Sequence, residues 1–336
     1  MSQPLLKVSP AGLFCPQGEF FIDPRQPVDR AVVTHAHADH ARKGCRRYLT
    51  SKDGERMLRT RLGGRGEIET LAYGECVEYR GVRVSLHPAG HILGSSQVRV
   101  EYQGEVWVVS GDYKVGPDVT CTPFEPVRCH TFITEATFAK PYYRWPDQQT
   151  VFEEINSWWR ENQRAGQASL LFAYSLGKAQ RLIAGVNPNI GPMFAHPDVE
   201  AINVDYRATG IPLPATPSTT EVQAPFRWRE SLVIAPPSAV DTHWARQFGE
   251  RTSAFASGWM LIPSMAERRG FERGFVLSDH ADWNELLWAI EETGAERVYV
   301  THGDEEDLIR ELTQRGIRAC ALSEAGQGFF QPSLFR

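Results

Sequence analysis

Residues 34–40 read Thr34-His-Ala-His-Ala-Asp-His40 and place four side chains that can bind metal within six residues. They follow Arg30-Ala-Val-Val-Thr34, an apolar and β-branched run that predicts a strand. A loop after a strand is where α/β proteins carry functional residues. Two imidazoles two residues apart can converge on one ion, and Asp39 and His40 then point towards a second position. A histidine-rich turn without a ligand is the alternative, but the four-residue pattern favours a metal site.

The composition limits the kind of protein that carries this turn. The chain has 336 residues, of which 42% are hydrophobic and 23% charged, so we expect a globular protein of roughly two domains. Its net charge of −5 means that nucleic-acid binding would depend on a local patch or on bound cations, not on bulk positive charge. No apolar run is long enough for a membrane span, and we see no signal peptide. The six cysteines form no Cys-x-x-Cys pair, which indicates reduced thiols in a cytoplasmic protein.

Hydrophobic patterning predicts an α/β fold whose first part alternates short β-runs with turns. One helical pattern, at 54–62, interrupts these runs. The continuous apolar run at 106–109 predicts a strand that is buried on both faces. Beyond residue 142 the pattern changes, and longer helices are predicted at 147–163 and 177–185.

The first pattern returns near the end of the chain. Short β-runs at 275–277 and 298–300 are each followed by a helical pattern. We therefore expect an α/β domain split in sequence between residues 1–142 and 273–336, with a smaller α/β domain inserted at 143–272. Within the insert, the nine prolines of residues 188–237 predict exposed loops.

The pattern His-x-His-x-Asp-His resembles the signature of the metallo-β-lactamase fold, an αββα sandwich. That fold requires a further histidine after a strand pair and a carboxylate at a strand end. His91, in Pro88-Ala-Gly-His-Ile-Leu-Gly-Ser95, and Asp112, in Val109-Ser-Gly-Asp-Tyr113, match this order and context. His87 lies close by, and we expect it to be structural.

Three later motifs resemble motifs A, B and C of the β-CASP nucleases, a branch of this fold that acts on nucleic acids. They are Glu135 in Thr-Glu-Ala-Thr-Phe, His280 in Leu-Ser-Asp-His-Ala-Asp and His302 in Val-Thr-His-Gly-Asp. Ala173-Tyr-Ser-Leu-Gly-Lys-Ala-Gln180 resembles the segment that opens the inserted domain of that branch. The resemblance covers essentially the whole chain, with its motifs in the family's order.

Within the branch, the chain is most similar to bacterial ligase-associated DNA exonucleases. The similarity rests on Phe21-Ile-Asp-Pro24, on residues 34–42 and 273–283, and on the short total length. These proteins are encoded near an ATP-dependent DNA ligase and a helicase, so the resemblance implies DNA as substrate, a role in DNA repair and an association with those two enzymes.

The resemblance also implies two divalent metal ions, zinc or manganese. Its ligand sets are His35, His37, His91 and Asp112 for the first ion, and Asp39, His40, His302 and the bridging Asp112 for the second. Two ions about 3.5–4 Å apart can share a hydroxide and clamp a phosphate. Asp39 would thus take part in catalysis as well as in binding.

The same resemblance assigns proton transfer to His280. We expect His280 to act as general acid on the leaving oxygen and Glu135 to orient it through a carboxylate–imidazole hydrogen bond. A satisfied buried histidine is the alternative for His280, and a simple turn-forming carboxylate is the alternative for Glu135.

Weaker signals point to phosphate contacts. Around a predicted helix start and a glycine turn, four residues are candidates for binding phosphate or nucleic acid: Ser175, Lys178, Gln180 and Ser257. An ordinary helix cap is the alternative for the first three. The basic run at 42–47 could track a nucleic-acid backbone or could be a solvated face.

The main hypothesis is therefore a metal-dependent DNA exonuclease. An RNA 3′-end processing nuclease is the alternative, because a histidine at motif C, here His302, is common in RNA-processing members of the branch. A small-molecule hydrolase is disfavoured, since motifs B and C and the inserted domain would have no purpose in it. A non-catalytic binding module is disfavoured because all seven expected ligands are present.

Overall fold

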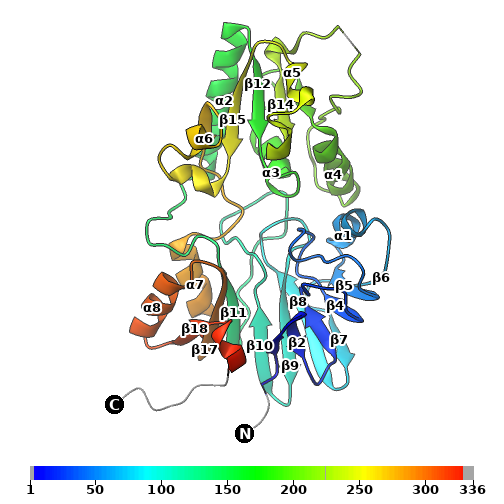
Figure 1. The fold of residues 1–336 in the computed structure, drawn as a ribbon, viewed down its shortest axis with the longest axis vertical. Helices are drawn as coiled ribbons and strands as arrows, with labels where there is room; N and C mark the ends of the chain where they lie inside the picture. The colour runs from blue at the N-terminus through cyan, green and yellow to red at the C-terminus, as the bar shows by residue number, and fades with distance from the viewer. Residues whose placement is uncertain (1–3, 224, 328–336) are drawn as a thin grey trace. The chain divides into compact units, whose positions relative to one another are not determined.

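The chain forms two compact units in the computed structural model, which describes residues 4–223 and 225–327 (Figure 1). Unit 1 holds residues 4–117, 121–144 and 280–327, and unit 2 holds residues 118–120, 145–223 and 225–279. Each unit is therefore assembled from segments that are distant in sequence.

The first sheet of unit 1 has six strands in sequence order. They are β1 (Lys7–Ser9), β2 (Gly12–Cys15), β3 (Phe20–Ile22), β4 (Arg30–Val32), β5 (Arg47–Ser51) and β6 (Glu67–Leu71). The first three strands pair antiparallel, and the pairs from β3 to β6 are parallel.

The second sheet of unit 1 has seven strands and joins residues 76–136 to residues 297–321. Its spatial order is β18 (Arg318–Ala321), β17 (Arg297–Gly303), β11 (Thr131–Ala136), β10 (Glu105–Val109), β9 (Ser96–Tyr102), β8 (Val82–Pro88) and β7 (Cys76–Tyr79). Strands β10, β11, β17 and β18 run parallel, so their carboxyl ends meet at one edge of the sheet.

Strand β10 shows how the second sheet is packed. Val106 and Val108 face the core shared with helices α7 (Trp283–Thr293) and α8 (Glu306–Gln314). Trp107 faces the opposite way, into the core shared with the first sheet. The predicted burial of residues 106–109 on both faces is thereby confirmed, since strand side chains alternate between faces.

Helix α1 (Glu55–Leu62) completes unit 1. It packs against β5 on the first sheet and buries Met57, Leu58 and Leu62. Unit 1 thus has the layers helix, sheet, sheet, helix, and the expected mixed α/β fold is confirmed. Burying a leucine or methionine side chain in such a core stabilises the fold by roughly 1.5–3 kcal/mol.

Unit 2 is built on a parallel five-stranded sheet. The spatial order is β13 (Met193–Ala195), β14 (Leu232–Ala235), β12 (Ala168–Phe172), β15 (Arg251–Ala256) and β16 (Arg273–Phe275). Its helices are α2 (Gln148–Ala165), α3 (Lys178–Gly185), α4 (Pro197–Ala208) and two single turns, α5 (His243–Arg246) and α6 (Met265–Arg268). Asp147 caps α2 by accepting a hydrogen bond from the Thr150 N–H.

Two features of unit 2 differ from the sequence expectations. Residues 273–279, expected to begin the last segment of the split domain, lie with unit 2 because β16 pairs with β15. The proline-rich stretch also contains β13, β14 and the twelve-residue helix α4. The helix tolerates its proline because Pro197 stands in the first turn, where a helix needs no backbone N–H donor.

All six cysteines are free thiols. Within residues 4–223 and 225–327, no helix combines the length and the apolar character that a bilayer span requires.

Candidate active site

The candidate site lies in unit 1, where loops from both sheets meet. His35, His37, Asp39 and His40 follow β4, and His91 lies in the turn between β8 and β9. Three further candidate residues lie at or just beyond the carboxyl ends of parallel strands. Asp112 comes after β10, Glu135 lies near the end of β11 and His302 lies near the end of β17.

A glycine allows two of these loops to touch. Gly111 has a φ of 57°, and a Cβ built on it would lie 2.7 Å from Cβ of Thr34. Any side chain at this position would therefore separate the Asp112 loop from the histidine loop. The small residue before Asp112 is thus a requirement of the site.

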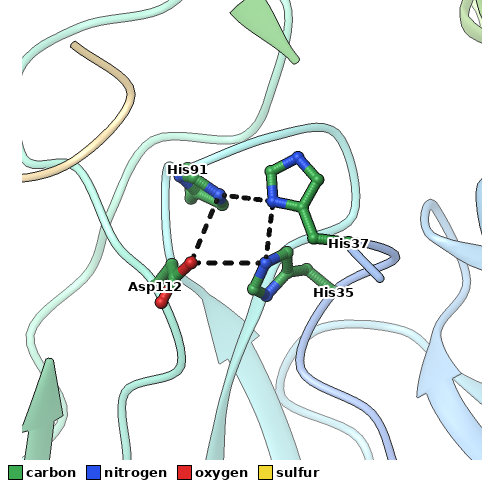
Figure 2. A group of neighbouring side chains, drawn as sticks. All are labelled: His35, His37, His91 and Asp112. Carbon is green, nitrogen blue, oxygen red and sulfur yellow. Dashed lines mark hydrogen bonds and ion pairs between the residues drawn. The ribbon is translucent and has the colours of Figure 1, made fainter. Parts of the chain in front are cut away.

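Figure 2 shows the first cluster, in which three histidines and Asp112 converge. His37 Nδ1 lies 3.1 Å from His35 Nε2 and 3.2 Å from His91 Nε2. Asp112 Oδ2 lies 3.5 Å from His35 Nε2 and 3.8 Å from His91 Nε2. Each residue therefore turns one ligand atom towards a common centre.

These separations fit a metal ion. Four donors placed about 2.0–2.1 Å from an ion at tetrahedral angles lie about 3.3 Å from one another. The 3.1–3.8 Å distances in the cluster bracket that value. His35, His91 and Asp112 are also buried, which protects such an ion from solvent.

The second cluster contains Asp39, His40 and His302. His40 Nε2 lies 3.6 Å from Asp39 Oδ2 and 3.5 Å from Asp112 Oδ2, and its ring stacks on that of His302 at 5.0 Å. The buried His40 Nε2 has no hydrogen-bond partner within the described part of the chain. A buried polar atom without a partner is costly unless something binds it, so this nitrogen fits a second metal ligand.

The backbone at His302 is unusual. His302 has a φ of 57°, and a Cβ added to the next residue, Gly303, would lie 2.0 Å from the carbonyl oxygen of Ala136. The β11–β17 register shifts at the same point, between Glu135 and Ala136. The Thr-His-Gly sequence thus lets β17 pass close to β11 while it turns His302 towards His40.

The charges of the site favour a bound cation. Burial alone would lower the pKa of His40, but the carboxylates of Asp112, Asp23 and Asp39 raise it to about 10. Burial would raise the pKa of Asp112, yet the neighbouring His40, His280 and His91 hold it well below its usual range. Burial and the nearby histidines hold the pKa of His35 well below the ordinary value.

Asp23 is a site residue that the motifs did not predict. Its Oδ2 lies 2.7 Å from His40 Nδ1 and accepts the Thr34 hydroxyl at 2.6 Å. Thr34 Oγ1 in turn lies 3.0 Å from His35 Nδ1. When the two Nδ1 atoms carry the protons, Nε2 of both histidines is the free ligand atom, an orienting role common around metal sites. The only sequence signal was the position of Asp23 in Phe21-Ile-Asp-Pro24.

Glu135 and His280 pair with each other beside the first cluster. His280 Nδ1 lies 2.8 Å from Glu135 Oε2, and the His280 ring lies 4.7 Å from that of His91. The Tyr113 N–H donates to Glu135 Oε1 at 2.7 Å, and the Thr137 hydroxyl donates to Oε2. Because Glu135 is buried and held by three donors, its orientation is fixed, and so is that of the partly exposed His280.

The four predicted phosphate contacts belong to unit 2. Lys178 is buried, with Nζ 2.5 Å from Asp279 Oδ2. Gln180 accepts the Gly177 N–H and donates to the Ser175 carbonyl oxygen, and Ser257 accepts the N–H of Trp259. These partners favour structural roles for Lys178, Gln180 and Ser257, while Ser175 is half-buried.

His87 also has a structural setting. Its Nε2 lies 3.0 Å from the Ser85 hydroxyl, and burial lowers its pKa. It belongs to neither histidine cluster.

The sequence is similar to those of several known proteins. A probable DNA ligase of Opitutus terrae is 30% identical over 325 residues, which cover 94% of this chain and 31% of that protein. An RNase J-like protein of Methanocaldococcus jannaschii is 24% identical over 183 residues, 48% of this chain and 44% of that protein. Endoribonuclease YSH1 of Yarrowia lipolytica is 27% identical over 144 residues, 42% of this chain and 17% of that protein. The chain thus spans less than half the length of each of these relatives.

A solved structure is similar in fold. A protein of unknown function from Enterococcus faecalis superimposes with a TM-score of 0.56 at 12% identity, covering 86% of this chain and 78% of that chain. No protein-family model matches the chain.

The layered fold and the histidine–aspartate clusters define a protein of the metallo-β-lactamase class. Together with the similarity to the RNase J-like and endoribonuclease chains, they narrow the class to one branch. The chain belongs to the β-CASP metallo-β-lactamase family.

Proposed function

We propose that this protein is a metal-dependent exonuclease that hydrolyses phosphodiester bonds from the ends of DNA strands, in DNA repair in the cytoplasm. The observation that carries the proposal is the convergence of three histidines and Asp112 beside the His280–Glu135 pair. Such a site unites ligands for divalent ions with a proton donor. Unit 2 is then the inserted β-CASP domain of a split metallo-β-lactamase domain.

The proposed ligands divide into two sets. His35, His37 and His91 would hold one ion and Asp39, His40 and His302 the other, with Asp112 shared. Divalent ions, zinc or manganese, would supply a nucleophilic water at neutral pH and offset the negative charge of a phosphate. Asp23 orients His35 and His40 towards this centre.

The acid step is assigned to His280. Glu135 engages Nδ1, so Nε2 is the nitrogen that can pass a proton to the leaving oxygen. The negative charge of Glu135 favours the protonated imidazole, and its two further donors keep the ring in one orientation.

DNA is favoured over RNA by the relative that covers nearly the whole chain. Its name, probable DNA ligase, supports a DNA substrate and an association with a DNA ligase; the association with a helicase rests on the resemblance alone. An RNA 3′-end processing nuclease is the second candidate. His302 in the second cluster and the names of the two ribonuclease relatives favour it.

The test uses matched DNA and RNA oligonucleotides of one sequence, labelled at either end, with zinc and with manganese. We expect stepwise shortening of DNA from one end, faster than that of RNA. Faster digestion of RNA would reject the DNA assignment in favour of the RNA one. No digestion of either strand with either metal would reject a nuclease function.

A further inference from the structure

The positive charge of this acidic chain is concentrated in one segment beside the candidate active site. Residues 42–65, the basic segment, contain nine lysine and arginine residues and two acidic residues, a net charge of +7 in a chain of net charge −5. The segment begins two residues after His40. Such a concentration of one sign of charge attracts a polyanion where the side chains are exposed and unpaired.

Most of these charges are exposed and uncompensated. Three arginines form ion pairs: Arg46 with Asp29, Arg47 with Glu67, and Arg59 with Glu55. The other six cations are exposed and form no ion pair with any described residue: Arg42, Lys43, Lys52, Arg56, Arg61 and Arg65. Leaving them unpaired favours a polyanionic partner.

The start of the basic segment is held in place beside the metal ligands. The buried Tyr48 hydroxyl accepts the Cys45 N–H at 2.9 Å and donates to the Arg42 carbonyl oxygen at 2.8 Å. This fixes the turn that carries Arg42 and Lys43, directly after the His-x-His-x-Asp-His motif. The backbone that carries the two cations therefore does not depend on binding to become ordered.

The middle of the basic segment packs against the turn that carries His91, a candidate metal ligand. The Ser51 hydroxyl donates to the Gly94 carbonyl oxygen at 2.6 Å, and a Cβ added to Gly94 would lie 2.2 Å from Cα of Gly54. Gly94 is three residues from His91. Helix α1, which starts at Glu55 and carries Arg56 and Arg61, thus begins against the active-site turn.

We infer that the basic segment is a binding surface for the phosphate backbone of a nucleic-acid strand, which it guides to the metal centre. This inference rests on the proposed nuclease function and names the surface that holds the substrate. The eight-residue helix α1 is about 12 Å long, which matches three or four nucleotides of a strand at a rise of 3.4 Å. Contacts to phosphate carry no sequence information, so binding is expected to be non-specific.

The test replaces four of the free cations with glutamine: Arg42→Gln, Lys43→Gln, Arg56→Gln and Arg61→Gln. The matched control removes the same charge from exposed arginines of unit 2 that likewise form no ion pair among described residues: Arg160→Gln, Arg164→Gln, Arg227→Gln and Arg229→Gln. Binding of a labelled oligonucleotide is followed by fluorescence anisotropy against salt concentration, with His280→Ala added to every protein so that the strand stays intact. Hydrolysis of a p-nitrophenyl phosphodiester is measured without His280→Ala.

For the basic-segment variant we expect affinity about 10- to 100-fold weaker and a slope of log K against log salt that is smaller by about 2–3. Its hydrolysis of the small ester should equal that of the unmodified protein, because the ester is too short to reach the segment. The control should keep the original salt slope. Equal slopes for the two quadruple variants, or no loss of affinity, would overturn the inference. If the unmodified protein digests no strand, the nuclease function is rejected. The binding measurement does not depend on digestion, so it would still test the basic segment as a binding surface.

Discussion

Both carboxylate oxygens of Glu135 face one nitrogen of His280: Nδ1 lies 2.8 Å from Oε2 and 3.0 Å from Oε1. The two residues are 145 positions apart in sequence and belong to different segments of unit 1. The same carboxylate accepts the Tyr113 N–H, which ties the pair to the loop that carries Asp112. The proposed proton donor and the proposed metal ligands thereby share one rigid support.

The first prediction concerns His280→Ala. A DNA strand leaves as an alkoxide that needs a proton, so we expect the rate of DNA hydrolysis to fall by about 10²–10⁴-fold. A p-nitrophenyl phosphodiester has a good leaving group and should retain most of its rate. Steady-state rates on both substrates and the metal content decide the result. Equal losses on both substrates, or a lost ion, would make His280 a ligand or a structural residue.

The second prediction concerns Glu135→Gln. The amide can still face the ring but no longer favours its protonated form, so DNA hydrolysis should fall less than in His280→Ala, by no more than about 10²-fold. The pH–rate profile is the readout, because loss of the negative charge should move its basic limb to lower pH. An unchanged profile would show that Glu135 acts only as a structural hydrogen-bond acceptor.

The third prediction concerns Asp112→Ala. As the carboxylate near both clusters, Asp112 should be needed for two bound ions and for any DNA hydrolysis. Elemental analysis should find two ions per chain in the unmodified protein and fewer in the variant. His87→Gln is the control, since His87 lies outside both clusters and should leave two ions in place. Full activity in Asp112→Ala would disprove the two-metal assignment.

The fourth prediction concerns Asp23→Asn. The amide cannot accept from His40 and Thr34 as the carboxylate does, so we expect metal affinity to fall by about 10–100-fold. Competition with a chelator of known affinity gives the measurement. Asp29→Asn removes an exposed carboxylate that pairs with Arg46 and should leave metal affinity unchanged. If the two variants behave alike, Asp23 does not orient the ligands.

The fifth prediction concerns Lys178→Met in unit 2. Removing Lys178 should lower the free energy of unfolding by about 1–3 kcal/mol, because the buried Asp279 carboxylate loses its nearer cation while Arg181 Nη1 remains 3.4 Å away. Urea unfolding measures this loss, and the exposed Lys43→Met is the control. A phosphate-binding lysine would behave differently: the variant would unfold like the control and show only a raised KM for DNA.

Local sequence was sufficient to predict much of this protein. The strand runs and helical patterns correspond to β4, β10, α1 and α2 because burial imposes regular periods on each element. The motifs of the candidate ligands were predictable for a related reason: each lies in a short loop beside a strand or near a strand end, so a few neighbouring residues define it. For the same reason the seven candidate ligands could be named before their distances were known.

Other features exist only in the tertiary structure, because their partners are far apart in the chain. Asp23 meets His40 across 17 positions, and Lys178 meets Asp279 across 101. In the sequence, a lysine next to a glycine turn resembles a phosphate ligand. In the fold, Lys178 instead pairs with the buried carboxylate of Asp279. Likewise, the sequence shows that residues 42–65 are basic, but it does not show that the Ser51–Gly94 hydrogen bond and the packing of Gly54 on Gly94 bring the segment to the His91 turn. Hydrogen bonds, ion pairs and close packing act at distances of 2–4 Å, so they depend on where the fold brings residues and not on their separation in sequence.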